Sequence, residues 1–245
     1  MSAVDWPGRS VTGVLLAAGR GKRLRPYTDR TPKSLLPIRG EPLLDYHLRL
    51  LESAGIRRLV LVLGYRGREV REHVEDRWPD LSRRTSFVEQ DPPRGTGDAL
   101  RRALRHVRTP WVLVAYSDVY WGPSPRILRR LLSGPAPRLV GAFVPDASEF
   151  GRLELRPGPR HPQLEGVAEK DGRATPGWVN AGLYLLPRDI SRELRRTGVS
   201  PRGEIELPEA IVRRNRRQTF EVLRTRTWWD IGTPARWDSA QGEGR

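Results

Sequence analysis

Short apolar runs alternate with segments of helical periodicity through the first two thirds of this 245-residue chain. Uninterrupted apolar runs are typical of strands that are buried on both faces of a sheet. The predicted strands are 11–17, 58–63, 85–88, 111–116 and 139–144. Apolar residues that recur every three to four positions predict helices between them, at 42–54, 68–77, 96–107 and 125–132. This order predicts an α/β fold with a doubly wound, mostly parallel mixed sheet.

The pattern changes after about residue 145, where prolines interrupt short extended pieces. We expect a small lobe here that lies over the strand ends and continues the same core. Its predicted elements are strands at 164–168, 178–186 and 219–225, and helices at 206–215 and from 234. Residues 1–10 and 240–245 are expected to be tails, which leaves one domain at 11–239.

The net charge of +15 comes from 44 basic residues, only three of which are lysines, so that 41 are arginines. These arginines are spread along predicted helices and are not interleaved with aromatic residues. That distribution is typical of solvated helix faces and argues against the alternative, a nucleic-acid groove.

Cysteine is absent from the sequence, which excludes disulfides and thiolate metal sites. The four scattered histidines form no ligand pair, so any metal should be a hard cation held by carboxylates and phosphates. No stretch approaches the roughly 20 apolar residues of a membrane helix, and the N-terminus lacks the apolar core of a signal peptide. We therefore expect a cytoplasmic protein without a membrane partner.

Residues 14–44 carry the most specific pattern in the chain. The apolar run 14–18 ends in a Gly19–Gly21 turn, and the cations Lys22, Arg23 and Lys33 follow. A strand that ends in free backbone N–H groups beside fixed cations is typical of a phosphate-binding site. A Walker loop would need serine or threonine after Lys22, and a Rossmann turn would need glycine at position 24, which is leucine.

The string LLAAGRGKRLRPYTDRTPKSLLPIRGEPLL resembles the N-terminal signature of the sugar-1-phosphate nucleotidylyltransferases, LAAGxGxRLxPxTxxxPKxLxPxxGxPLL. Within this family the chain resembles the thymidylyl- and uridylyltransferases of glucose 1-phosphate and the N-acetylglucosamine-1-phosphate enzymes. The resemblance implies a Rossmann-like nucleotidyltransferase domain, with a nucleotide half at about 11–144 and a sugar-phosphate half at about 145–239. We expect no C-terminal β-helix of the kind that several members of this family have.

A second segment places Gln90 ahead of Gly95-Thr96-Gly97, between a strand and a helix. An amide both donates and accepts hydrogen bonds, so it can recognise a base edge. The alternative is an ordinary helix start with Thr96 as N-cap. The resemblance implies the following nucleotide-binding residues: Leu16, Ala17, Ala18, Gly19, Gly21, Lys22, Arg23, Gln90, Gly95 and Thr96.

Two aspartates and four further residues complete the implied site. Asp118 ends a predicted strand, after Ser117 where the family usually has glycine, and Asp230 stands in a Trp-Trp-Asp-Ile-Gly segment. The resemblance implies that both bind Mg²⁺, although Asp230 could merely end its strand, with Thr233 as the next N-cap. Sugar-phosphate binding is implied for Gly151, Glu169, Lys170 and Asn180. Glu169 and Lys170 could instead be a surface ion pair of little energy.

The implied reaction transfers a nucleotidyl group from a nucleoside triphosphate to a sugar 1-phosphate and releases pyrophosphate. Arg23, Lys33 and Asp118 are the expected catalytic residues, with Mg²⁺ as Lewis acid and template. UTP or dTTP with glucose 1-phosphate or a related hexose 1-phosphate is the preferred pair. Three alternatives stay open: a GTP-dependent mannose- or heptose-1-phosphate guanylyltransferase, a choline-phosphate cytidylyltransferase, and a non-catalytic nucleotide-binding regulator. A homo-oligomer is compatible with each of them.

Overall fold

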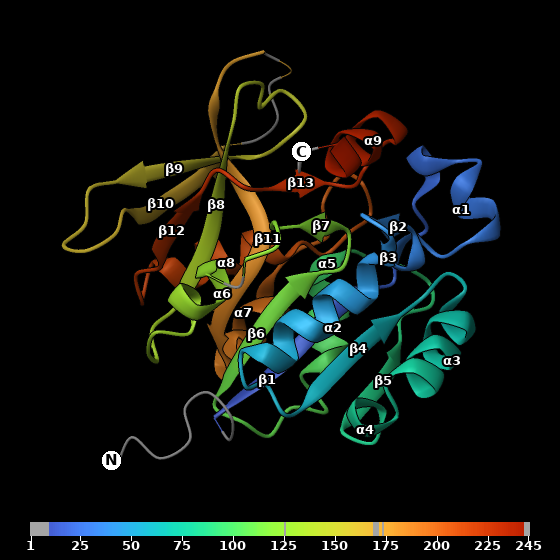
Figure 1. Ribbon diagram of the computed structural model, residues 1–245. Coiled ribbons are helices and arrows are strands. Elements are labelled where there is room, and N and C mark those ends of the chain that lie inside the picture. The colour runs from blue at the N-terminus through green and yellow to red at the C-terminus, as the bar shows by residue number, and fades with distance from the viewer. Residues whose placement is uncertain (1–9, 125, 169–171, 173, 243–245) are drawn as a thin grey trace.

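A nine-stranded sheet forms the centre of the computed structural model, which describes residues 10–242 apart from 125, 169–171 and 173. The strand order is β5-β4-β1-β6-β11-β8-β12-β10-β9, as Figure 1 shows. The strands are β1 (Val11–Ala17), β4 (Leu59–Leu63), β5 (Thr85–Glu89), β6 (Trp111–Tyr116), β8 (Arg138–Val144), β9 (Arg152–Arg156), β10 (Gln163–Ala168), β11 (Gly177–Pro187) and β12 (Glu221–Thr225). Strands β5, β4, β1 and β6 run parallel, as the apolar runs predict.

Antiparallel pairing enters the sheet at β11, which pairs with β6 on one side and β8 on the other. The chain leaves β8, forms β9 and β10, and returns beside β8 without a crossover helix, so β11 runs in the opposite direction. The mixed α/β sheet is therefore confirmed, but its antiparallel part is larger than the alternation of apolar runs and helices indicates.

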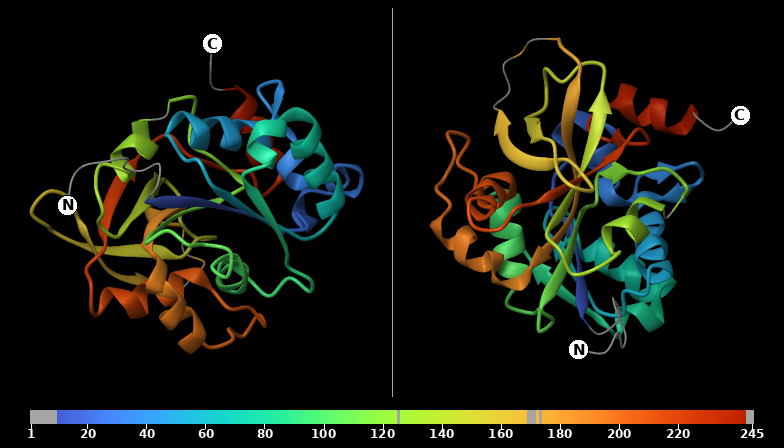
Figure 2. Two further views of the ribbon diagram at one scale, coloured as in Figure 1. Left: turned by 90° about the horizontal axis from the view of Figure 1, so that it is seen from below. Right: turned by 90° about the vertical axis from the view of Figure 1, so that its left-hand side faces the viewer.

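Helices cover both faces of the sheet (Figure 2). Side chains of β1 alternate between the two layers, with Leu15 in one buried cluster and Val14 and Leu16 in the other. This alternation explains why β1 is an unbroken apolar run that is buried at every position. The first cluster contains residues of α2 (Leu43–Ser53), α3 (Gly67–Arg77) and α6 (Arg126–Leu131); the second contains residues of α5 (Thr96–Ala103), α7 (Ser191–Arg196) and α8 (Leu207–Asn215).

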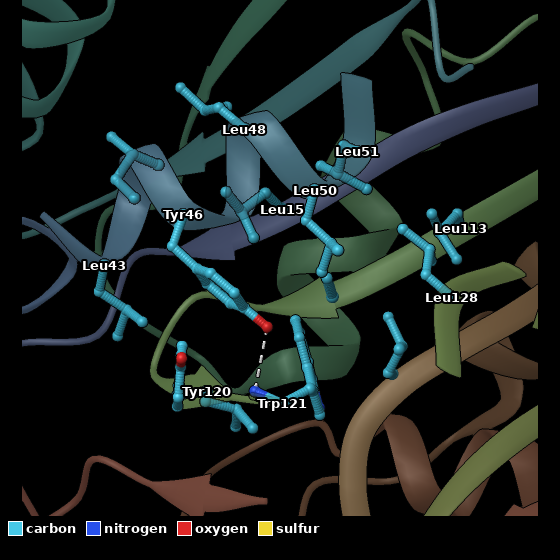
Figure 3. Close-up of a cluster of buried hydrophobic side chains, with 14 of the residues drawn as sticks. Leu15, Leu43, Tyr46, Leu48, Leu50, Leu51, Leu113, Tyr120, Trp121 and Leu128 are labelled. Carbon is cyan, nitrogen blue, oxygen red and sulfur yellow. Dashed lines mark hydrogen bonds between the residues drawn. The ribbon is translucent and has the colours of Figure 1, made fainter. Parts of the chain in front are cut away.

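Helix α2 packs its apolar side against the sheet and also fixes the segment that follows β7 (Val119–Tyr120), as Figure 3 shows for Tyr46 and Trp121. The Tyr46 hydroxyl accepts a hydrogen bond from the backbone N–H of Trp121 at 3.1 Å and donates one to the carbonyl of Gly122 at 3.0 Å. A buried hydroxyl needs such partners because water cannot reach it. The loop that contains Asp118 is thereby anchored to the core.

Several smaller elements lie around the carboxyl ends of the strands, whereas α4 (Pro79–Ser82) precedes the amino end of β5. Helix α9 (Pro234–Gly242) runs past residue 239, where a tail was expected, and Trp237 donates its indole N–H to the carbonyl of Pro37 at 2.8 Å. None of the helices in the described part of the chain is long and apolar enough to span a membrane. The remaining elements are α1 (Tyr27–Arg30), β2 (Pro37–Ile38), β3 (Glu41–Pro42), α4 (Pro79–Ser82), β7 (Val119–Tyr120) and β13 (Trp229–Asp230).

Candidate active site

The loops after β1 and β6 lie side by side because these strands are parallel neighbours, with Leu16 in register with Tyr116. The backbone N–H of Ser117 continues this pairing by donating to the carbonyl of Leu16 at 3.1 Å. The glycine turn and Asp118 therefore meet at the carboxyl edge of the sheet, where open α/β sheets bind ligands.

A cavity of about 290 Å³ opens at this edge, and we call it the β1–β6 cavity. It brings together most residues that the resemblance implies for the nucleotide. The expected residues in its wall are Leu16, Ala17, Ala18, Gly19, Lys33, Gln90, Gly95, Thr96 and Asp118. Sequence analysis did not identify the other lining residues as parts of a binding site: Ser34, Pro93, Ala99, Tyr116, Ser117 and Glu204.

The turn beside Gln90 is shaped by a segment more than 100 positions away. Gln90 is buried and donates its amide hydrogens to the carbonyl of Gly95 at 2.9 Å and to Asp98 at 3.1 Å. Gly95 has a φ of +90°, and a Cβ there would lie 2.5 Å from the carbonyl oxygen of Ile205. Gly95 is itself the N-cap of α5, so Thr96 is not; the Thr96 hydroxyl instead accepts a hydrogen bond from the N–H of Leu207 at 3.2 Å.

Of the described residues expected to bind nucleotide, Gly21, Lys22 and Arg23 are absent from the cavity wall. Gly21 has a φ of +66°, and a Cβ there would lie 2.9 Å from Cγ2 of Thr28 and 3.3 Å from Cβ of Lys33. Lys22 and Arg23 are exposed on the turn that follows. Glycine at position 21 thus lets this turn pack closely against Lys33.

The two predicted metal aspartates are neighbours in the structure. Strand β13 pairs antiparallel with β7, which places Asp230 opposite Val119, and the N–H of Ile231 donates to the carbonyl of Asp118 at 2.8 Å. Burial, together with the charge of Asp118, raises the pKa of Asp230. The pairing of β13 with β7 thus brings together two acids that are 112 positions apart in the sequence.

Lys33 supplies the positive charge beside Asp118, with its Nζ 2.7 Å from Oδ2 of the carboxylate. Burial favours the protonated form of Asp118, but the Lys33 ammonium outweighs it and holds the pKa of Asp118 below its ordinary value. A charge-assisted hydrogen bond of this length is among the stronger kinds. Lys33 therefore keeps Asp118 ionised.

Arg236 and Glu149 were missed by sequence analysis, and they connect Asp230 to Arg23. Arg236 donates from Nη1 to Oδ2 of Asp230 and from Nη2 to Oε2 of Glu149, both at 2.7 Å. Nη1 of Arg23 lies 3.7 Å from the same Glu149 oxygen. The Thr233 hydroxyl also accepts the N–H of Arg236 at 3.4 Å, as expected of an N-cap. A capping role for Thr233 is therefore compatible with a place for Asp230 in the acid pair.

The donor set of the acid pair fits a hard divalent cation. Two neighbouring carboxylates raise the free-energy cost of ionising one another, so they need positive charge between them. Lys33 hydrogen-bonds to Asp118 and Arg236 hydrogen-bonds to Asp230. Among the described residues, no cluster of three or more His, Cys, Asp or Glu surrounds a common point. Water and phosphate oxygens would complete the coordination of such an ion, as is usual for Mg²⁺.

A second cavity, of about 570 Å³, lies on the Asp230 side of the acid pair. It is lined by Phe143, Val144, Pro145, Asp146, Ser148, Glu149, Phe150, Arg226, Trp228, Trp229, Asp230, Arg236 and Ser239. Aromatic rings with neighbouring polar groups suit a hydroxylated ligand that has apolar C–H faces. The acid pair thus lies between two cavities, with Asp118 in the wall of the first and Asp230 in the wall of the second.

The four predicted sugar-phosphate residues differ in how the structure places them. Gly151 follows Phe150 at the second cavity, and a Cβ there would lie 3.2 Å from Cγ1 of Val167. The Asn180 side chain is held within the protein, since Nδ2 donates to the Tyr184 hydroxyl and Oδ1 accepts from the N–H of Gly182. Glu169 and Lys170 lie outside the described residues.

An open α/β sheet with a glycine turn and an acid pair at its carboxyl edge defines a nucleotide-binding α/β protein. Residues 12–241 match the family model described as nucleotidyl transferase, so the chain belongs to that family. The resemblance seen in residues 14–44 is therefore confirmed at the level of the family.

Individual relatives carry names that specify the reaction further. The chain is 29% identical over 221 residues to the bifunctional sugar-1-phosphate nucleotidylyltransferase/acetyltransferase of Sulfurisphaera tokodaii, covering 90% of this chain and 52% of that protein. It therefore spans about half the length of that relative. It is 27% identical over 232 residues to the UTP–glucose-1-phosphate uridylyltransferase AglF of Haloferax volcanii, covering 93% and 94% of the two chains.

A solved structure confirms the fold. The chain is similar to a UDP-glucose pyrophosphorylase complexed with UDP-glucose, with a TM-score of 0.80 and 21% sequence identity. The similarity covers 94% of this chain and 96% of the other. The arrangement of the central sheet is thus shared with an enzyme of nucleotide-sugar chemistry.

Proposed function

We propose that the protein transfers a nucleotidyl group from a nucleoside triphosphate to a sugar 1-phosphate, with Mg²⁺, giving a nucleotide sugar and pyrophosphate. One observation carries the proposal: Lys33, Asp118 and Asp230 lie together between two cavities. Two adjacent cavities suit a donor and an acceptor that must meet, and an acid pair between them suits a metal that contacts both. The names of the relatives support a sugar 1-phosphate as acceptor.

The difficulty of this reaction is electrostatic, because a phosphate oxygen of one anion must attack the α-phosphorus of another. The nucleophile is already charged near neutral pH, so the reaction needs no general base. Lys33 would neutralise phosphate charge beside Asp118, and Arg23 would stabilise the leaving pyrophosphate from the glycine turn. Lys170 would hold the acceptor phosphate. Fixed cations of this kind stabilise developing charge without reorganisation of the site.

Asp118 and Asp230 would hold the Mg²⁺ ion, which when bound supplies Lewis acidity and a template for phosphate oxygens. Asp118 is ionised for this role by the Lys33 ammonium. Burial disfavours the charge of Asp230, and Arg236 opposes that effect from 2.7 Å. Lys33 and Arg236 thus favour the ionised forms of Asp118 and Asp230, which are the forms that would bind a metal ion.

Gln90 and Gly95 would receive the base, since both line the β1–β6 cavity beside the start of α5. The amide hydrogens of Gln90 are donated to Gly95 and Asp98, so its amide oxygen would accept the ring N–H of a uracil or thymine base. UTP or dTTP with glucose 1-phosphate, or a related hexose 1-phosphate, is the preferred pair, in line with the AglF relative. A cytoplasmic location and a homo-oligomeric state stay predictions.

Pyrophosphate release over a matrix of five triphosphates and a panel of phosphorylated acceptors tests the proposal. We expect the largest rate with a pyrimidine triphosphate and a hexose 1-phosphate, and loss of that rate on chelation of the metal. Pyrophosphate release with GTP and mannose or heptose 1-phosphate, or with CTP and choline phosphate, would show that this pair, and not UTP or dTTP with glucose 1-phosphate, is the substrate pair. Nucleotide binding without pyrophosphate release under any combination would overturn the proposal in favour of a non-catalytic regulator.

A further inference from the structure

A groove lined by arginines lies at the edge of the sheet opposite to the acid pair. It consists of two neighbouring cavities of about 520 and 370 Å³, and Arg188 and Arg195 line both of them. The backbone N–H of Arg188, which follows β11, donates to the carbonyl of Pro110, which precedes β6, at 2.8 Å. The groove therefore lies at the amino end of β6, whereas Asp118 follows the carboxyl end of that strand.

The charged residues of this lining are almost all basic, and we call the surface the arginine groove. Its arginines are Arg101, Arg105, Arg108, Arg188, Arg192 and Arg195. The single lining acid is Asp189, and its carboxylate is shared with Arg214 outside the groove, at 3.1 Å. Arg192 approaches the same carboxylate only to 3.8 Å. Six arginines and one aspartate give the lining a formal charge of +5.

Four arginines of the groove have no carboxylate partner in the part of the chain that the structure describes. They are Arg105, Arg108, Arg188 and Arg195, and all four are exposed. Helix α3 shows the contrast, because Arg68 and Arg71 there pair with Glu72 and Glu75 at 2.7 and 2.8 Å. Like charges that line one cleft focus the field and attract anions into it. The groove thus has the electrostatic character of an anion site, whereas α3 has that of a balanced surface.

The chemistry of the groove favours a ligand with at least two phosphoryl groups. Guanidinium groups bind phosphoryl oxygens through paired N–H groups, and two joined cavities can each receive one phosphoryl group. Two phosphoryl groups carry about three to four negative charges near neutral pH, which is close to the charge of four arginines. Among the described residues, no aromatic side chain lines either cavity, so the stacking surface that single-stranded nucleic acids use is missing.

We propose that the arginine groove binds a small polyphosphorylated anion, held chiefly by Arg105, Arg108, Arg188 and Arg195. These arginines come from the segment between α5 and β6, the turn after β11, and helix α7. Their backbones are fixed before the ligand arrives, which lowers the entropic cost of binding. The inference goes beyond the proposed function, because the groove shares no residue with the acid pair or its two cavities. The alternative is a basic surface that attracts every anion weakly.

Calorimetry with inorganic tripolyphosphate in EDTA tests the site in the full chain. The double variant Arg188→Gln with Arg195→Gln removes the two arginines that both cavities share. We expect its Kd for tripolyphosphate to be at least about tenfold higher than that of the wild type, as for the loss of charge-assisted hydrogen bonds. Sulfate should bind the wild type at least about tenfold more weakly than tripolyphosphate does, because a single dianion cannot occupy both cavities.

The matched control is the double variant Arg68→Gln with Arg71→Gln, which removes the same charge from α3. Its Kd for tripolyphosphate should change by less than about twofold, since exposed charges beyond a Debye length are screened. Because Arg188 and Arg195 are exposed, their replacement should leave Tm in EDTA within about 2 °C of the wild-type value. Tripolyphosphate should then raise the Tm of the wild type and of the α3 control, but not that of the groove variant. The single variant Arg195→Gln should have an intermediate Kd.

Lys33→Met distinguishes binding in the groove from binding at the acid pair. It should keep the tripolyphosphate affinity that the groove variant loses, whether or not the protein releases pyrophosphate from any triphosphate. The inference is refuted if Lys33→Met loses this affinity and the groove variant keeps it, if both double variants weaken binding equally, or if sulfate binds as tightly as tripolyphosphate. A short DNA duplex that binds more tightly than tripolyphosphate, and does so through Arg188 and Arg195, would overturn it in favour of a nucleic-acid surface.

Discussion

Replacement of Lys33 by methionine removes the ammonium beside Asp118 but keeps a side chain of similar length. The pair is 2.7 Å apart, with 12% of the Lys33 side chain and 36% of the Asp118 side chain exposed. Two unit charges at that separation attract by about 6 kcal/mol at an effective dielectric constant of about 20. Desolvation and partial exposure offset most of this attraction, which leaves a net contribution of about 2 kcal/mol.

We therefore expect Lys33→Met to lower the free energy of unfolding by about 2 kcal/mol in EDTA at neutral pH. Asp118 then faces Asp230 without its chief counter-charge. Saturating Mg²⁺ restores positive charge at the same carboxylates, so the difference from the wild type should shrink below about 1 kcal/mol. Urea denaturation in EDTA and in Mg²⁺ measures both values.

Lys22→Met is the control, because Lys22 is an exposed lysine on the turn before α1. It should change stability by less than about 0.5 kcal/mol in either buffer. The reasoning is refuted if Lys33→Met is as stable as the wild type in EDTA. It is also refuted if Mg²⁺ leaves the difference as large as in EDTA, since the metal would then not replace the missing charge.

Three further predictions concern catalysis, pH and the backbone. Arg23→Ala should reduce pyrophosphate release by about 10² or more, as for the loss of one preorganised electrostatic contact; a near-normal rate would contradict its role. Because burial and the neighbouring acid raise the pKa of Asp230, Mg²⁺ affinity measured by calorimetry should fall from pH 7 to pH 5, and this pH dependence should be weaker in Asp230→Asn. Gly182→Ala should cost about 2–4 kcal/mol of stability, from its positive φ and the contact with Tyr116. Gly203→Ala has a similar φ and open space around it, so it should cost only about 1–2 kcal/mol; equal costs would show that the tyrosine ring moves aside.

Several parts of the site are contiguous in sequence, and these could be predicted without coordinates. The glycine turn after β1 is local, because its residues lie within one short segment. Consecutive backbone N–H groups in such a turn are typical of phosphate sites, so the sequence could indicate the candidate site here. The apolar runs of β1, β4 and β6 are equally local, since burial on both faces requires apolar side chains at every position. The positions of Asp118 and Asp230 followed from their motifs.

The partners of these residues could not be predicted, because they come from distant elements. Arg236 meets Glu149 across 87 positions, and in a chain with 41 arginines nothing in the local pattern distinguishes this one. The helix start at Thr96 was predicted correctly, but its N-cap is Gly95, because the segment around Ile205 binds the turn. Tertiary contacts of this kind override local capping preferences.

The amino-acid sequence by itself determined the nucleotidyltransferase family, the strands of the parallel half and the glycine turn after β1, because each depends on neighbouring residues or on a local period. The tertiary structure alone decided that β11 runs antiparallel, that its bulge at Gly182 admits the ring of Tyr116, and that Lys33 and Arg236 each balance one acid of the pair. Those features depend on which segments become neighbours in space. A periodic pattern shows which side of a strand is buried, but it does not show which strand or charge lies against it.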